Sequence, residues 1–299
     1  PIPVIAASTP SDCFEMAFEA VRIALQHMTP VILLSDGYIA NGAEPWKYPN
    51  ASDLPKIDVH FKTGLDEGEE KFLPYKRNEK LARPWAIPGT PGLEHRIGGL
   101  EKQAETGNVS YDSDNHEFMV KTREAKVEKI ADYIPLQTID SGKEKGKVLV
   151  VGWGSTYGTI KSAVQELQEK GKDVSHAHIK YMRPFPKNLG EILKNYETVL
   201  IPEINNGQLI KIIRDKYFID AKGFNRIMGS PIAKHELVAE IEKLGVKAKA
   251  YKTNAADLAA CESFVNDVVS SFGTVDICVN NAGISKDNLL LRMTPEQWD

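Results

Sequence analysis

A glycine-rich turn is the first feature of the chain that offers chemistry. Gly152, Gly154 and Gly158 follow an apolar run typical of a strand and precede a helical pattern. The backbone N–H groups of such a turn, with a helix N-terminus, can hold an anion. However, dinucleotide sites use Gly-x-Gly-x-x-Gly, whereas the third glycine here comes one position later, and Asp173 precedes the next strand instead of ending it. We therefore expect a plain tight turn.

Small and amide residues follow two apolar runs near the C-terminal end of the chain. The run at 275–279 leads into Asn280, Asn281, Ala282 and Gly283, and the run at 247–252 is followed by Asn254 and Ala255. Parallel strands present their carboxyl ends at one edge of an open α/β sheet, and small residues there let a ligand approach the backbone. Asparagine side chains can also brace neighbouring strands. The pattern favours a binding edge.

Acid and base groups also gather between the predicted elements. Asp36 ends an apolar run, where a carboxylate can reach a ligand but more commonly caps a turn. A second group consists of Glu94, His95, Arg96 and His116. A histidine near a carboxylate can act as an acid–base pair, but without a second partner at fixed spacing we expect structural hydrogen bonding.

His176, His178 and Lys180 alternate along one predicted strand, which places all three side chains on one face. We expect this face to be polar surface or interface.

The composition excludes several classes of protein. The chain has 299 residues, a net charge of -4 and no block of like charges, so no nucleic-acid or anionic-lipid partner is expected. No run is long enough to span a membrane. Cys13, Cys261 and Cys278 lie far apart, which gives neither a disulfide framework nor a metal site. With no secretory signal visible, we expect a cytoplasmic protein.

The periodicity predicts an α/β protein. A helix begins near residue 12 and a buried strand covers 30–34; residues 39–107 are irregular and rich in proline, but their aromatic residues indicate an ordered arm. A helix at 115–134 and a polar hinge follow. Strands and helices then alternate. Strands are predicted at 147–151, 174–179, 199–201, 246–251 and 275–279, and helices at 156–169, 189–194, 208–218, 236–244 and 257–272.

Up to about residue 231 the chain resembles the alpha subunits of 2-oxoacid:ferredoxin oxidoreductases, in particular those acting on 2-oxoglutarate. The resemblance rests on residues 29–40, 92–101, 106–109 with 115–116, and 152–156. It implies the C-terminal part of a pyrimidine-binding domain at 1–56, an arm with one helix at 57–145, and a transketolase-C-like parallel-sheet domain at 146–231.

The same resemblance implies a function for the intact complex. A beta subunit supplies the diphosphate site for thiamine diphosphate, and the complex converts a 2-oxoacid to an acyl-CoA while passing electrons to ferredoxin. The family's Tyr-Pro-Ile-Thr-Pro-type segment and its activating glutamate have no counterpart in this sequence. No catalytic residue is carried over, and we expect the chain alone to be inactive.

From about residue 232 to 299 the chain resembles 3-oxoacyl-[acyl-carrier-protein] reductases, which are short-chain dehydrogenases, through residues 236–242, 275–283 and 287–293. The resemblance implies a partial Rossmann fold in which Asn254, Ala255 and the Asn280, Asn281, Ala282 and Gly283 turn contact NADP. The family's glycine-rich loop and its catalytic serine, tyrosine and lysine are missing. Without an acid to supply the proton during hydride transfer, we expect no reductase activity.

The joint falls within 233–241, a helical pattern that suits both families. Pro1 is not a methionine, and residues 294–296 begin a helix near the last residue, so we read both ends as truncated. Three readings stay open: a subunit fragment of a thiamine-diphosphate enzyme, a dinucleotide-binding module, or a chimera without a function of its own, joined from two unrelated genes by sequence assembly.

Overall fold

The computed structural model describes residues 1–244, 251–254 and 256–278. The chain divides into two compact units, Pro1–Leu244 and Gly245–Asp299. Among the described residues, no helix has both the length and the apolar character needed to cross a membrane.

A three-stranded sheet opens the first unit. β1 (Val4–Ala6) lies between β2 (Ile32–Leu34), which is parallel to it, and β7 (Tyr181–Arg183), which is antiparallel. Helix α1 (Asp12–His27) packs Met16 and Ile23 against this sheet, and the short helix α2 (Gly37–Asn41) follows β2. Because β7 comes from the second half of the unit, the first sheet depends on residues far along the chain.

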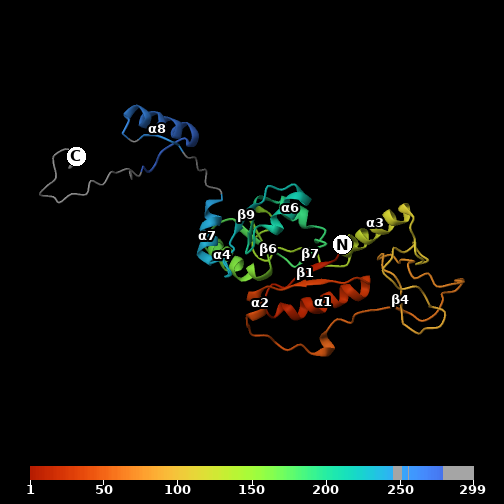
Figure 1. The fold of residues 1–299 in the computed structure, drawn as a ribbon. Coiled ribbons are helices and arrows are strands. Elements are labelled where there is room, and N and C mark those ends of the chain that lie inside the picture. Colours follow the sequence, from red (N-terminus) through yellow and green to blue (C-terminus); the bar gives the residue numbers. More distant parts are fainter. Residues whose placement is uncertain (245–250, 255, 279–299) are drawn as a thin grey trace, which may run out of the picture. The chain divides into compact units, whose positions relative to one another are not determined.

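A four-stranded parallel sheet forms the second half. Its order is β6 (Val174–Ile179), β5 (Gly146–Trp153), β8 (Tyr196–Glu203) and β9 (Lys222–Asn225). Helices α5 (Leu189–Lys194) and α6 (Gln208–Tyr217) cover one face, and α4 (Tyr157–Glu169) and α7 (Lys234–Lys243) cover the other (Figure 1). Burial on both faces explains the near-continuous apolar runs of β5 and β8.

The arm is ordered, as predicted, although little of it is regular. A 3-10 turn at Ala51–Asp53 lies just before it. The arm contains a two-residue parallel pair of β3 (Phe61–Lys62) and β4 (Trp85–Ala86), and helix α3 (Ser113–Lys129), which ends in a 3-10 turn at Ile130–Asp132. The indole N–H of Trp85 donates to the Leu25 carbonyl at 2.7 Å. This bond anchors the arm on α1.

Three predicted strands differ from the structure. β2 pairs only with β1, and Ile32 is 45% exposed, so β2 is an edge strand and not the buried strand predicted for 30–34. Residues 275–278 form no strand, and neither does Tyr251; the rest of both predicted strands lies outside the described residues. A strand needs a partner for its backbone hydrogen bonds, and the described part of the second unit contains none.

The described part of the second unit is built on one helix. α8 (Leu258–Phe272) was predicted, and Asp257 caps it by accepting a hydrogen bond from the Ala260 N–H at 3.2 Å. Tyr251 packs edge-on against Phe264, with ring centroids 5.3 Å apart. No residue of α8 is buried.

Candidate functional site

The carboxyl ends of both sheets line a cleft of about 920 Å³. Ser8 follows β1, Asp36 follows β2, Ser155 follows β5 and Ile204 follows β8, and all four line this cleft. Lys234, at the start of α7, also lines it and forms an ion pair with Glu166 at 2.7 Å. This edge is where open α/β folds place ligands.

Asp36 is the central carboxylate of the cleft. Its Oδ1 accepts hydrogen bonds from the Tyr38 and Ile39 N–H groups, each at 3.0 Å, and so caps α2. Its Oδ2 accepts a hydrogen bond from the Ser155 N–H at 3.1 Å. Asp36 therefore has the capping role that the sequence made the commoner expectation, and it also joins the two halves of the unit.

The glycine-rich turn is tight, as expected. Gly154 has φ +60°, and a 3-10 turn at Gly154–Thr156 precedes α4. The Thr156 hydroxyl accepts from the Trp153 N–H at 3.2 Å and donates to the Trp153 carbonyl at 2.7 Å. A Cβ on Gly152 would lie 2.4 Å from Ile160. Because Asp36 is bonded to the Ser155 N–H, the anion position at this turn is filled by the chain's own carboxylate.

A second, polar cavity of about 280 Å³ adjoins the cleft through Ser8 and Thr9. On its wall, the Lys180 ammonium lies 2.6 Å from Asp12 Oδ1. Asp12 Oδ2 accepts from both the N–H and the hydroxyl of Ser8, at 2.9 and 2.7 Å. Lys180 leads into β7 and Asp12 opens α1, so this pair is a second bond between the two halves.

The expectation that His176 and His178 lie on a polar surface is wrong. Their exposed fractions are 0% and 5%, and their rings lie 5.6 Å apart beneath the Tyr157 ring of α4. Residues 140 and 141 cover the free edge of β6: Asp140 and Ser141 bond the His176 backbone, and Asp140 Oδ2 accepts from the His178 N–H at 2.7 Å. Residues 140 and 141 lie 35 or more positions before the histidines in the chain, so the alternation of residues within the strand did not predict this burial.

Neither ring of this histidine pair has a hydrogen-bond partner among the described residues. Burial and the charge of Lys161 lower the pKa of His176 to about 4. Burial, His176 and Lys180 lower the pKa of His178 to about 3, against a weak opposing effect of the Gly154 carbonyl. Both rings are therefore neutral at pH 7, and His178 also lines the polar cavity.

Glu203, at the end of β8, was not recognised from the sequence. It is completely buried, and its carboxylate accepts from the Trp153 indole, the Asn205 amide and the N–H groups of Leu209 and Ile210, at 3.0 to 3.2 Å. These bonds hold the N-terminus of α6 against the sheet. The sequence signal that could have identified Glu203 is an acidic residue at the end of an apolar strand, shortly before a helix.

Three family models match the chain. They are the thiamine-diphosphate-binding domain of pyruvate flavodoxin/ferredoxin oxidoreductases over residues 1–113, core domain II of pyruvate:ferredoxin oxidoreductase over 146–236, and short chain dehydrogenase over 219–299.

Individual relatives agree with this division. The 2-oxoglutarate oxidoreductase subunit KorA of Mycobacterium tuberculosis is 48% identical over 231 residues, which are 77% of this chain and 34% of that protein. The 3-oxoacyl-[acyl-carrier-protein] reductase FabG of Staphylococcus aureus is 44% identical over 71 residues, 24% of this chain and 29% of that protein. The chain combines a 2-oxoglutarate oxidoreductase alpha-subunit region with a short-chain dehydrogenase segment.

A solved structure supports the first assignment. The 2-oxoglutarate:ferredoxin oxidoreductase from Magnetococcus marinus matches with a TM-score of 0.75 and 28% identity, over 81% of this chain and 42% of that chain. The chain thus spans about a third of the KorA and FabG relatives and less than half of this structure.

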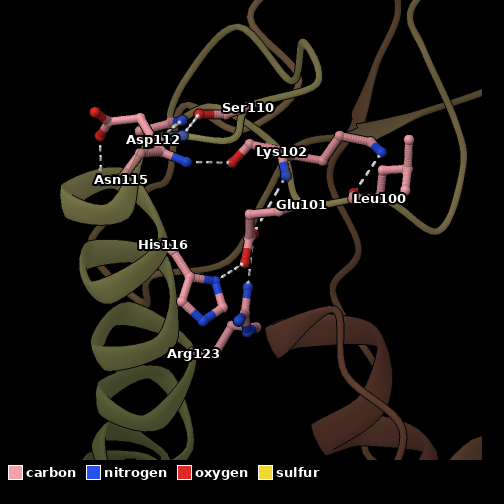
Figure 2. Close-up of polar contacts among 9 residues, drawn as sticks. Leu100, Glu101, Lys102, Ser110, Asp112, Asn115, His116 and Arg123 are labelled. Atoms are coloured by element: carbon pink, nitrogen blue, oxygen red, sulfur yellow. Dashed lines mark hydrogen bonds and ion pairs between the residues drawn. The ribbon is translucent and has the colours of Figure 1, made fainter.

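Within the alpha-subunit region, residues from two of the motifs that carried the resemblance, 92–101 and 115–116, meet beside α3 (Figure 2). His116 Nδ1 lies 2.6 Å from Glu101 Oε2, and Arg123 donates to Glu101 Oε1 at 3.3 Å. The Asn115 side chain donates to the Lys102 carbonyl at 3.0 Å and accepts from the Ala104 N–H at 2.8 Å. Partial burial raises the pKa of Glu101, but the bonds from His116 and Arg123 lower it below its usual value.

This arrangement separates the residues that the sequence grouped together. His116 pairs with Glu101 and not with Glu94. His95 bonds the Leu93 carbonyl at 2.8 Å and packs edge-on against Phe72, whereas Glu94 and Arg96 are exposed. His95 has the structural hydrogen bond that was expected, whereas His116 has a carboxylate partner in Glu101.

In the short-chain dehydrogenase segment, only one predicted cofactor contact can be described. Asn254 Oδ1 accepts from the Ala256 N–H at 3.2 Å, within the turn that leads to Asp257 and α8. Ala255, Asn280, Asn281, Ala282 and Gly283 lie outside the described residues. Across the part of the chain that the structure describes, no group of side chains is arranged to hold a metal ion.

Proposed function

We propose that residues 1 to about 231 are part of the alpha subunit of a 2-oxoacid:ferredoxin oxidoreductase that acts on 2-oxoglutarate. In the intact complex, the reaction is oxidative decarboxylation to an acyl-CoA, with electrons passed to ferredoxin. The observation that carries the proposal is the 48% identity to KorA over 231 residues. The related Magnetococcus marinus structure holds 2-oxoglutarate, coenzyme A and succinyl-CoA.

The described cleft does not fit the diphosphate of thiamine diphosphate. Its anion position is filled by Asp36, and Glu44 on its wall is a further carboxylate, whose pKa is lowered by hydrogen bonds from Ser11 and Thr9. Negative groups at this edge repel a diphosphate. This supports a diphosphate site on a beta subunit, and we assign no catalytic step to residues of the cleft.

The boundaries of the proposal follow the two families. We propose a pyrimidine-binding part at 1–56, an arm at 57–145, a transketolase-C-like domain at 146–231 and a dehydrogenase segment at 232–299. A cytoplasmic location is part of the same proposal, because the three cysteines lie far apart in the sequence and do not suggest a disulfide framework.

An association experiment tests the proposed function. The full chain is mixed with the beta subunit of a 2-oxoglutarate oxidoreductase and examined by analytical ultracentrifugation, and 2-oxoglutarate-dependent ferredoxin reduction is measured on the mixture. We expect a complex, and no reduction by the chain alone. Residues 1–244 should associate equally well, and residues 245–299 should not associate. A full chain that sediments independently of the beta subunit would contradict the proposal.

A second candidate function rests on the match to FabG, which implies an NADP-binding module. Against it, α8 has no buried residue, and Leu258 is 76% exposed. A helix that buries no face gains little stability from packing. Saturable NADPH fluorescence on addition of the full chain is the result that would favour this candidate.

The chain can also be a join of two unrelated genes. The match to core domain II ends at residue 236 and the match to short chain dehydrogenases begins at residue 219. The two matches therefore overlap over 219–236, which includes the start of α7. Single DNA molecules read across the codons for residues 227–243 decide the question. In-frame molecules establish a genuine fusion, whereas reads that continue only into the separate parent genes establish an artefact.

A further inference from the structure

Four cationic side chains of the arm lie close enough for their charges to interact. Arg77 and Arg83 belong to the arm, and Arg123 and Lys126 lie one turn apart on α3. All four are partly buried. Each of these cations gives up solvent while it faces like charges, and this costs free energy unless counter-charge is present.

Most of these cations have neutral partners. Arg77 donates to the Leu81 carbonyl at 2.8 Å, and Lys126 donates to the Met28 carbonyl at 2.9 Å. The Arg83 guanidinium lies 4.5 Å above the centre of the Tyr75 ring. Among the described residues, only Arg123 of the four has a carboxylate within 4.0 Å, namely Glu101.

Burial among like charges, with few carboxylates nearby, lowers the pKa values of Lys126 and Arg77. Burial lowers the pKa of Lys126 to about 8, with contributions from the charges of Arg77, Arg83 and Arg123. Burial, Arg83 and Arg123 lower the pKa of Arg77, and only Tyr75 opposes them. The four groups therefore lie close enough to repel one another, and an anion placed among them would relieve that repulsion.

A cavity of about 610 Å³ opens beside this cluster. Arg77 lines it directly, together with Lys121 and the apolar side chains of Leu81 and Phe118. Phe118 is 55% exposed, so an apolar surface lies next to the charges. Glu105 is the carboxylate on the wall and limits the positive charge on that side.

We propose that this cavity is a binding site for an organic phosphate. The Arg77 guanidinium is the primary phosphate ligand because its planar fork matches two phosphate oxygens, and the neighbouring cations favour a dianion. The apolar part of the ligand packs against Leu81 and Phe118. The inference rests on the cluster and the cavity alone and does not depend on the function proposed above.

Isothermal titration calorimetry on the full chain tests the site, with phenyl phosphate and inorganic phosphate as probes at constant ionic strength. We expect saturable binding of both, tighter for phenyl phosphate. Arg77→Gln should weaken phenyl phosphate binding about tenfold or more, because a bond to a charged partner is lost. Arg83→Gln should weaken it by a smaller factor, because it removes only a charge beside the site. Arg226→Gln is the matched control, since Arg226 also lies over an aromatic ring, 4.4 Å from the centre of Phe224, far along the chain.

Several results would overturn the proposal. Failure of the wild-type chain to bind phenyl phosphate saturably refutes the site, and so does equal binding by wild type and both arm variants. Equal affinity for the two probes refutes the part assigned to Leu81 and Phe118. If Arg77→Gln does not fold, Arg77→Lys replaces it; retaining the charge without the fork should still weaken binding, and unchanged affinity in that variant counts against the proposal.

Discussion

Asp36 and Ser155 lie 119 positions apart in the chain and are joined by a 3.1 Å hydrogen bond from the Ser155 N–H to Asp36 Oδ2. The bond connects the turn after β2 to the turn before α4. With the Lys180–Asp12 ion pair and the pairing of β1 with β7, it joins the three-stranded sheet and the parallel-sheet domain within one compact unit.

Asp36→Ala should destabilise the first unit by about 1–3 kcal/mol, because it removes both the cap of α2 and the bond to Ser155. Asp36→Asn should cost less, since its amide oxygen can still cap α2. Urea unfolding followed by circular dichroism measures both free energies. Asp58→Ala, at an exposed aspartate, is the control and should be neutral. An Asp36→Ala variant as stable as wild type would show that the bond contributes little.

The buried histidine pair should make the protein sensitive to acid. The folded pKa values of His176 and His178 are about 4 and 3, below the value of about 6.5 for an unfolded histidine. The unfolded chain therefore binds more protons below pH 6.5, and stability falls as the pH drops from there towards 4. Each histidine contributes a slope of up to about 1.4 kcal/mol per pH unit.

Unfolding free energies between pH 7 and pH 4.5 test this sensitivity. A His176→Gln, His178→Gln double variant should be less stable at pH 7 but should lose less stability on acidification. His60→Gln replaces an exposed histidine and should leave the slope of wild type unchanged. If the double variant and wild type show the same slope, the two rings are not the source of the acid sensitivity.

Helix α7 should be part of the first unit even though the dehydrogenase model also covers it. Leu237 is completely buried against α4, together with Val238 and Ile241. Leu237→Ala should therefore cost about 2–5 kcal/mol in unfolding free energy. Leu258→Ala is the matched control on α8, where the leucine is 76% exposed, and should change little. A small effect at Leu237 would show that α7 contributes little to the first unit.

Gly107 should tolerate no side chain. Its φ is +69°, and an added Cβ would lie 2.9 Å from both Pro74 and the Tyr75 ring. Gly107→Ala should lower the free energy of unfolding by about 1–3 kcal/mol, from backbone strain and from displacement of the arm. Gly99→Ala is the control, because Gly99 has open space around it and no positive φ. Equal melting temperatures of the two variants would contradict this expectation.

The helices and strands predicted most accurately from the sequence pattern are those that the local sequence alone can specify. β6 and α5 have the predicted bounds, and α8 differs by one residue at its start. By contrast, β1 and β7, which the periodicity did not predict, have three residues each. So short a segment becomes a strand only when neighbours supply hydrogen bonds, and β7, one of the two neighbours of β1, lies more than 170 positions away from it.

The features of the candidate site also divide into those that depend on local sequence and those that depend on residues distant in the chain. Sequence pattern alone indicated that the glycine turn is tight and that Asp36 caps a turn, because both depend on residues within a few positions. It did not indicate that Asp36 occupies the anion position of that turn, or that His176 and His178 are buried. It also did not indicate that His116 pairs with Glu101. Those partners lie 15 to 119 positions apart in the chain.

The amino-acid sequence by itself determined the α/β class, most of the helices and the two families that share this chain, because periodicity and motifs are local properties. Only the tertiary structure decided which carboxylates, histidines and arginines face one another. Burial and charge interactions depend on distance in space, and folding brings residues from distant parts of the chain within a few ångströms of each other.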